Sequence, residues 1–192
     1  MIGDGILTLD QSGALADSVI VTSFIAGSAA LYDWAADNPQ LILTRTETTN
    51  DVAQIARQPK MTAINTAMQV DLFGQANASH VPGHVHSGAG GQDDFVDGAL
   101  RARDGEAILA LPAWHEPSDS STIVAKLLGP ASSFQPSHVV TDVGTARVWG
   151  RTAQDQAFDL IEHAAAPRAR AKLWDAAIGA GAGTWAPLVA SA

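Results

Sequence analysis

The 192-residue chain has no cysteine, few basic residues and no long apolar run. Without cysteine it can form neither a disulfide framework nor a cysteine-ligated zinc site. Eleven Lys and Arg residues stand against twenty Asp and Glu residues, which gives a formal net charge of −9. Nucleic acids and anionic membrane surfaces are bound through clustered cations, so we expect neither as a partner. No stretch approaches the roughly 18 apolar residues that a membrane-spanning helix needs.

Length and composition indicate one folded domain. The first 30 residues lack the basic segment and apolar run of a secretory signal, and this absence, with that of cysteine, favours a cytoplasmic location. The hydrophobic fraction of 46% is typical of a folded soluble protein. A chain of this length can bury one core of its own. We therefore expect a single domain over residues 1–177 and an Ala/Gly-rich tail over residues 178–192.

Short β-branched runs alternate along the chain with segments of helical periodicity. The expected strands, of which the first is a buried one, are residues 19–24, 41–44, 61–73, 107–111 and 138–141. The expected helices are residues 29–36, 51–57, 94–103, 153–165 and 168–177, and a long loop occupies residues 74–91. This alternation predicts an α/β fold with an open, largely parallel sheet and flanking helices.

A cluster of three glycines stands before the third expected helix. Gly88, Gly90 and Gly91 are followed by Asp93 and Asp94, either of which is a good N-cap. Glycine permits positive φ angles and lets a ligand approach the backbone closely. The free N–H groups at such a helix start suit a phosphate, a pyrophosphate or the oxyanion of a tetrahedral intermediate. A tight turn leading into a capped helix explains the same residues equally well, so spacing alone leaves both interpretations open.

Known glycine motifs do not fit this loop. No Gly-Lys-Ser/Thr follows, as a P-loop requires, and Asp93 stands where a dinucleotide-binding loop has its third glycine. Val85 stands where a nucleophile elbow, Gly-x-Ser-x-Gly, has its first glycine.

Other polar clusters are weaker candidates. His80, His84 and His86 lie close together, but no carboxylate accompanies them at ligand spacing, so we expect no metal. His115 has an acidic neighbour and no nucleophile nearby. Trp114 follows an expected strand and is a candidate for the wall of a binding pocket.

Several ordered blocks extend along nearly the whole chain. The two longest are Ile-Asn-Thr-Ala-Met-Gln-Val-Asp-Leu-Phe-Gly-Gln at 64–75 and Ser-Gly-Ala-Gly-Gly-Gln-Asp-Asp-Phe at 87–95. Shorter blocks are found at 27–28, 31–33, 38–39, 50–51, 110–112, 123–124 and 139–146. Together they resemble the acetyl-CoA hydrolase/transferase family, which includes the 4-hydroxybutyrate and butyrate–acetate CoA-transferases. The resemblance implies the carboxy-terminal domain of such an enzyme, with a fold of the NagB/RpiA/CoA-transferase type.

The resemblance also implies a reaction. Family members are ping-pong enzymes in which a glutamate carboxylate attacks an acyl-CoA thioester and CoA is transferred to that glutamate. A small carboxylate or water then resolves the intermediate, so acyl-CoA and coenzyme A are the implied substrates and no metal is involved. The implied catalytic residues are Gly91, as an oxyanion donor, Asn50 and Asp142. The implied CoA-binding residues are Gly88, Gly90, Gly91 and Gln92.

This chain departs from the family pattern at three positions. Asp142 stands where the family usually has glutamate and is one methylene shorter. Ala113 and Trp114 replace the small hydroxyl residues that usually follow Leu-Pro.

The family's nucleophile falls outside the chain. In the family, the glutamate precedes a segment much like residues 1–6, so it would fall one residue before Met1, and Asp4 matches an Asp-Gly turn instead. We therefore expect the isolated chain to be inactive and to need an amino-terminal half, in the same polypeptide or in a separate chain. The apolar face left for that half also favours a homo-oligomer. The alternative is a non-catalytic CoA-binding or scaffolding subunit that pairs with a separate amino-terminal-half chain.

Overall fold

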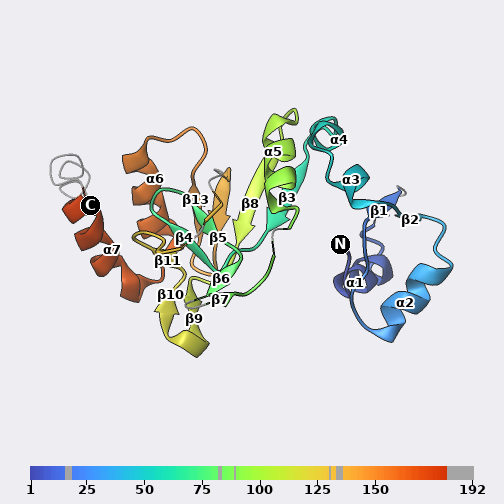
Figure 1. The fold of residues 1–192 in the computed structure, drawn as a ribbon, viewed down its shortest axis with the longest axis horizontal. Coiled ribbons are helices and arrows are strands. Elements are labelled where there is room, and N and C mark those ends of the chain that lie inside the picture. The colour runs from blue at the N-terminus through green and yellow to red at the C-terminus, as the bar shows by residue number, and fades with distance from the viewer. Residues whose placement is uncertain (16–18, 82–83, 89, 130, 133–135, 181–192) are drawn as a thin grey trace. The chain divides into compact units, whose positions relative to one another are not determined.

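The computed structural model describes residues 1–15, 19–81, 84–88, 90–129, 131–132 and 136–180. These residues form two compact units, Met1–Ile55 and Ala56–Ala192 (Figure 1). The segment expected to be one domain, residues 1–177, contributes to both. The last helix extends to Ala180, so the expected tail begins as helix, and residues 181–192 lie outside the described part.

The first unit is a small parallel pair of strands with short helices. Its elements are α1 (Gly5–Gln11), β1 (Ile20–Thr22), α2 (Ala29–Ala36), β2 (Leu41–Leu43), α3 (Thr46–Thr49) and α4 (Val52–Ala56). The expected helix at 29–36 is confirmed, whereas α1 and α3 are not anticipated by periodicity. The expectation of a buried strand at residues 19–24 is wrong in one respect, since Val19, Val21 and Phe24 are exposed. Too few apolar groups surround β1 to bury it.

The second unit is built on a four-stranded sheet in the order β13-β12-β8-β3. Its strands are β3 (Thr62–Asn65), β8 (Glu106–Ala110), β12 (His138–Val140) and β13 (Thr145–Arg147). The strands β3, β8 and β12 are parallel, and β13 pairs with β12 in the antiparallel sense. The expectation of an α/β domain with a largely parallel sheet is confirmed.

Several shorter strands surround this sheet. They are β4 (Gln69–Asp71), β5 (Ala76–Asn77), β6 (His80–Val81), β7 (His84–Val85), β9 (Trp114–His115), β10 (Ser120–Ser121) and β11 (Ile123–Val124). The single strand expected at 61–73 is wrong, because residues 66–68 break it into β3 and β4, which belong to different sheets. The loop expected at 74–91 contains β5, β6 and β7.

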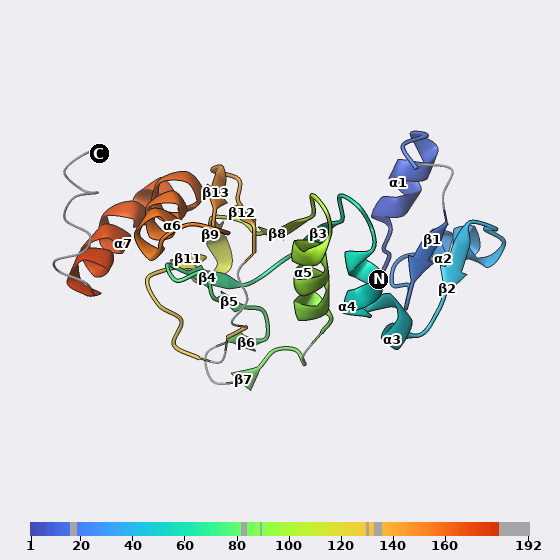
Figure 2. The same ribbon diagram turned by 90° about the horizontal axis from the view of Figure 1, so that it is seen from above.

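Helices cover one face of the sheet in two groups. The helices next to the sheet are α5 (Gln92–Arg101), α6 (Ala153–Asp159) and the π-helical turn η2 (Leu160–Ala164). The last helix, α7 (Pro167–Ala180), packs against η2. Between β9 and β10 lies the short 3-10 helix η1 (Glu116–Ser118). The helix α5 lies along β3 and β8 (Figure 2), where Val96 and Ala99 pack with Ala63 and Ala107. The α6–η2 segment contacts β12 and β13, and Leu160 belongs to the larger core there.

A buried carboxylate organises the turn after β4. The side chain of Asp71 is fully buried, and its Oδ1 accepts from the N–H groups of Phe73 and Gln75, both at 3.0 Å. Its Oδ2 accepts from Gln75 Nε2 at 3.2 Å and from Leu127 N at 3.3 Å. Within this turn Gly74 has a φ of +77°, which favours glycine. Asp71 and Gly74, both within block 64–75, therefore have a structural role.

Replacing Asp71 with Ala should destabilise the chain by about 3 kcal/mol, because four N–H donors lose the buried carboxylate that accepts their hydrogen bonds. Urea unfolding followed by circular dichroism measures this change. Asp97→Ala is the matched control. That carboxylate lies on the exposed side of α5 and pairs with Arg101 at 2.7 Å, so its loss should cost about 0.5 kcal/mol or less. Equal losses from both variants would contradict the structural role of Asp71.

Candidate active site

The parallel strands place three chain segments at one edge of the sheet. Asn65, at the end of β3, is in register with Leu109, and Val140, at the end of β12, is in register with Ala110. The segments that follow β3, β8 and β12 therefore leave the sheet on the same side. In open α/β sheets, this carboxyl edge is where ligands bind.

The glycine loop meets this edge at the start of α5. Gly91 is the N-cap residue, with φ −85° and ψ 13°, and its carbonyl accepts from Phe95 N at 3.1 Å. The first helical residue, Gln92, donates from Nε2 to the carbonyl of Thr66 at 3.2 Å. Because Thr66 directly follows β3, this contact fixes the amino-terminal end of α5 beside the carboxyl edge. The N–H groups of a helix's first turn have no partner within the helix.

The expected N-cap role of Asp93 or Asp94 is wrong. The helix begins at Gln92, so both residues lie in its first turn and Gly91 is the cap. In that position a carboxylate interacts favourably with the positive end of the helix dipole.

The backbone conformation of the described part of the loop does not require glycine. Among the described residues, the glycines with positive φ are Gly13, Gly74 and Gly150. Gly88 and Gly90 are exposed, and a Cβ added to either would meet no heavy atom within 4 Å. Neither packing nor a positive φ therefore requires glycine at these two positions.

The segment after β12 is held to the segment after β8. Asp142 lies in the turn between β12 and β13, and its Oδ1 accepts from Ala113 N at 2.6 Å. Beside it, the hydroxyl of Thr141 donates to the carbonyl of Ala164 at 2.8 Å. Gly144 completes the turn, where a Cβ would stand 2.7 Å from the carbonyl oxygen of His163. The exposed Asp142 carboxylate thus positions the loop that follows β8.

Trp114 packs against α7, and this contact gives the residue a structural role. The Arg168 guanidinium lies over its ring, with Cζ 3.6 Å from the ring centroid. Its indole Nε1 donates to Asp119 Oδ1 at 3.2 Å, and Arg168 also pairs with Glu116 at 3.0 Å. These contacts tie the β9–β10 hairpin to the start of α7.

One donor at the carboxyl edge is not anticipated from the sequence. Asn65 Nδ2 is buried and has no hydrogen-bond partner within the described part of the chain. Asn65 shares a face of β3 with Ala63, which packs against α5. Its position at a strand end, within block 64–75, is the signal that could have singled it out.

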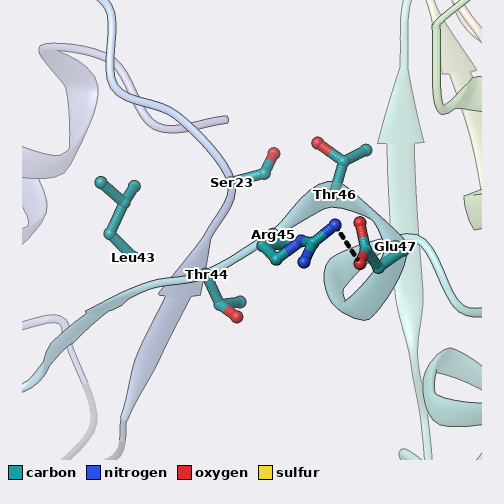
Figure 3. Close-up of a pocket in the computed structure, with 6 residues that line it drawn as sticks. All are labelled: Ser23, Leu43, Thr44, Arg45, Thr46 and Glu47. Carbon is teal, nitrogen blue, oxygen red and sulfur yellow. Dashed lines mark ion pairs between the residues drawn. The ribbon is translucent and has the colours of Figure 1, made fainter.

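Asn50 belongs to the first unit, whereas the glycines and Asp142 belong to the second. Asn50 is the C-cap residue of α3, and its Oδ1 accepts from the hydroxyl of Thr49 at 2.9 Å. Just before it, the segments that follow β1 and β2 form an open pocket (Figure 3). The pocket is lined by Ser23, Leu43, Thr44, Arg45, Thr46 and Glu47. Arg45 and Glu47 form an exposed ion pair at 2.8 Å within it. Sequence reasoning did not single out these residues.

The histidine cluster lies on the β6–β7 hairpin and its flank. His80 pairs across the hairpin with Val85, and its Nδ1 is 2.7 Å from the hydroxyl of Ser79. His84 is on β7, and the N–H of His86 donates to the carbonyl of Ser79. In the described ranges, no group of three or more His, Asp or Glu side chains is arranged to hold a metal ion.

Asp4 ties the start of the chain to α2. Its Oδ1 accepts from the hydroxyl of Ser28 at 2.7 Å and from the N–H of Ser28 at 3.0 Å. These two hydrogen bonds, the hydroxyl one first, lower the pKa of Asp4 below its usual value. Gly27 leaves the necessary room, since a Cβ there would stand 2.8 Å from Asp4 Oδ1.

Asp4→Asn should lower the free energy of unfolding at pH 7 and make little difference at low pH. A carboxyl group whose pKa is lower in the folded state stabilises the fold above its unfolded pKa, about 3.9. This contribution is lost as the pH falls through the folded pKa. Urea unfolding between about pH 3 and pH 7 measures the difference, with Asp33→Asn as the control for loss of an exposed charge. A pH-independent effect of Asp4→Asn would contradict the role given to the Ser28 hydrogen bonds.

Comparison with known proteins decides the family. Residues 27–177 match the acetyl-CoA hydrolase/transferase C-terminal domain. The chain belongs to this family. The 4-hydroxybutyrate coenzyme A transferase of Clostridium kluyveri is 33% identical over 172 residues, which cover 84% of this chain and 40% of that protein. The succinyl-CoA:acetate/propanoyl-CoA:succinate CoA transferase of Fasciola hepatica is 30% identical over 174 residues, 84% of this chain and 36% of that protein.

Solved structures agree with the sequence comparison. RipA from Yersinia pestis superimposes with a TM-score of 0.84 at 29% identity, over 92% of this chain and 42% of RipA. The 4-hydroxybutyrate CoA-transferase from Porphyromonas gingivalis has a TM-score of 0.76 at 30% identity, over 91% of this chain and 43% of that protein. The resemblance and the CoA-transferase-like fold are confirmed. The chain spans less than half the length of each of these relatives.

None of the helices in the described segments is long and apolar enough to cross a membrane.

Proposed function

We propose that this chain is the carboxy-terminal half of an acyl-CoA:carboxylate CoA-transferase or acyl-CoA hydrolase, and that its glycine loop binds the acyl-CoA thioester. The observation that carries the proposal is the open backbone at Gly88 and Gly90. The fold does not require glycine at either position, whereas a ligand approaching the backbone does. The loop leads into α5 beside the carboxyl edge, where bound ligands are expected.

In the proposed reaction, this chain stabilises the negative charge that develops on the thioester carbonyl oxygen. When a carboxylate attacks the thioester carbon, the carbonyl oxygen becomes an oxyanion before the C–S bond breaks and the CoA thiolate leaves. The N–H of Gly91, at the positive end of the α5 dipole, is the donor that this chain contributes. Gln92, held to Thr66, fixes the direction of that helix end, and Gly88 and Gly90 leave room for CoA.

Two further residues have proposed roles, one in each unit. Asp142 holds the loop after β8 through Ala113 N, so it positions one wall of the site. For Asn50, in the first unit, the family resemblance implies a role in orienting the reacting groups. The acceptor is a small carboxylate or water. The nucleophilic glutamate belongs to an amino-terminal half, which is consistent with relatives more than twice as long as this chain.

Gly90→Val should leave stability within about 0.5 kcal/mol of the wild type, because its side chain meets no neighbour. It should weaken acetyl-CoA binding at least about tenfold, because the side chain occupies the space proposed for the ligand. Calorimetric titration of the chain assembled with its amino-terminal half measures the affinity. Gly129→Val is the matched control, since Gly129 is also exposed and free of neighbours within 4 Å. Unchanged affinity for Gly90→Val would contradict the proposal.

The 192-residue chain alone should not transfer CoA from acetyl-CoA to butyrate, and addition of an amino-terminal half that carries the glutamate should give activity. The physical reason is that the covalent step requires a nucleophile that the glycine loop cannot supply. Formation of butyryl-CoA and acetate is followed by liquid chromatography, with a Glu→Gln variant of the added half as the inactive control. Robust CoA transfer by the isolated chain would contradict the assignment of the nucleophile to the amino-terminal half. Binding of acetyl-CoA without transfer by the assembly would favour the scaffolding alternative.

A further inference from the structure

The described residues of the first unit form almost no core of their own. Its buried apolar side chains are Leu31 and Ile55, whereas the second unit contains two apolar clusters. The large apolar side chains exposed on the first unit are Met1, Leu9, Val19, Val21, Phe24, Tyr32, Ile42 and Leu43. A segment of about 55 residues needs a larger buried area than this to be stable by itself.

These exposed groups concentrate on the two parallel strands. Val21 on β1 and Ile42 on β2 are directly opposite in the register and are 53% and 48% exposed. Val19 lies on the same face of β1 by alternation and is 58% exposed. Parallel sheets are ordinarily covered on both faces, and two isolated strands are at best marginally stable in water without further packing. The face formed by Val19, Val21 and Ile42 is called the β1–β2 face below.

Among the described residues, β1 is paired along one edge by β2, and no other strand pairs with its outer edge. Ile20 N donates to Gln40 O at 2.8 Å, and Thr44 N donates to Thr22 O at 2.9 Å. Because backbone groups alternate along a strand, these bonds direct the N–H and C=O of Val21 to the other edge. Natural proteins protect exposed edges with Lys or Pro, yet residues 19–24 and 41–44 contain no charged residue and no proline.

We propose that the β1–β2 face and the outer edge of β1 form the docking surface for the amino-terminal half of the enzyme. This inference rests on the proposed function, which requires such a half. More than half the length of each relative lies outside the region matched by this chain. The match to the family's C-terminal domain begins at residue 27, so β1 precedes that domain. An apolar, uncharged surface of this kind is typical of obligate interfaces.

The absence of cysteine permits a direct test by single-site labelling. Val21→Cys places a thiol on the β1–β2 face, and Leu128→Cys places one at a fully exposed position of the second unit. In the isolated chain, both thiols should react rapidly with a maleimide. When the chain is assembled with its amino-terminal half, labelling at position 21 should slow at least about tenfold, whereas labelling at position 128 should not change.

Three results would overturn the inference. Slow labelling of Val21→Cys in the monomeric chain would show that the chain itself covers this face. Protection that increases with the concentration of the isolated chain would assign the face to a second copy. Unchanged labelling in a verified assembly would place the interface elsewhere.

A second variant tests the energetic contribution of the same face. Val21→Asp should weaken assembly with the amino-terminal half about thirtyfold or more, because it introduces a charge into an apolar contact. Thr145→Asp, exposed on β13, is the control, and circular dichroism verifies folding of both. CoA transfer by the wild-type assembly is measured in parallel. Protection at position 21 without CoA transfer overturns the proposed function and supports the docking surface. CoA transfer without protection at position 21 supports the proposed function and overturns the docking surface.

Discussion

The parallel pairing of β3, β8 and β12 is the constraint on which the candidate site depends. Three strands that run in one direction deliver the segments that follow them to one edge of the sheet. The crossover from β3 to β8 then places the start of α5 at this edge, and the Gln92–Thr66 hydrogen bond fixes it there. The Asp142–Ala113 hydrogen bond joins the other two segments. Sequence-distant residues therefore share one edge without a large number of direct contacts between them.

The glycine loop shows how structure separates two explanations that spacing leaves open. A tight turn would require glycine through positive φ, as at Gly74. Gly88 and Gly90 have no such requirement, and no neighbour restricts a side chain at either position. The other explanation is a ligand at the exposed backbone before α5, where the positive end of the helix dipole favours an anion. The physical case for a ligand is thus stronger than the motif alone provides.

Periodicity predicts much of the fold, and the elements that it predicts wrongly have physical explanations. The helix at residues 29–36 and the strands near 107–111 and 138–141 are predicted because local pattern and tertiary role agree. The break at residues 66–68 is missed because apolar residues continue on both sides of it. The pairing of β4 with β5, which follows a turn, and with β11, which is distant in the sequence, shows that β4 joins another sheet. Asn50 and Asp142 were reached through family resemblance. The Asp142–Ala113 contact spans 29 residues, a distance that local spacing cannot encode.

The expected buried strand at residues 19–24 contains the most informative disagreement. Its apolar, uncharged pattern predicts burial, yet the chain leaves Val19, Val21 and Phe24 exposed. A run of apolar residues indicates that its side chains are buried in the functional protein. It does not indicate whether the same chain or another one covers them. The second unit satisfies its own pattern because two apolar clusters enclose its strands. The first unit does not, and the mismatch between pattern and burial is what identifies β1 and β2 as an interface and not as a free surface.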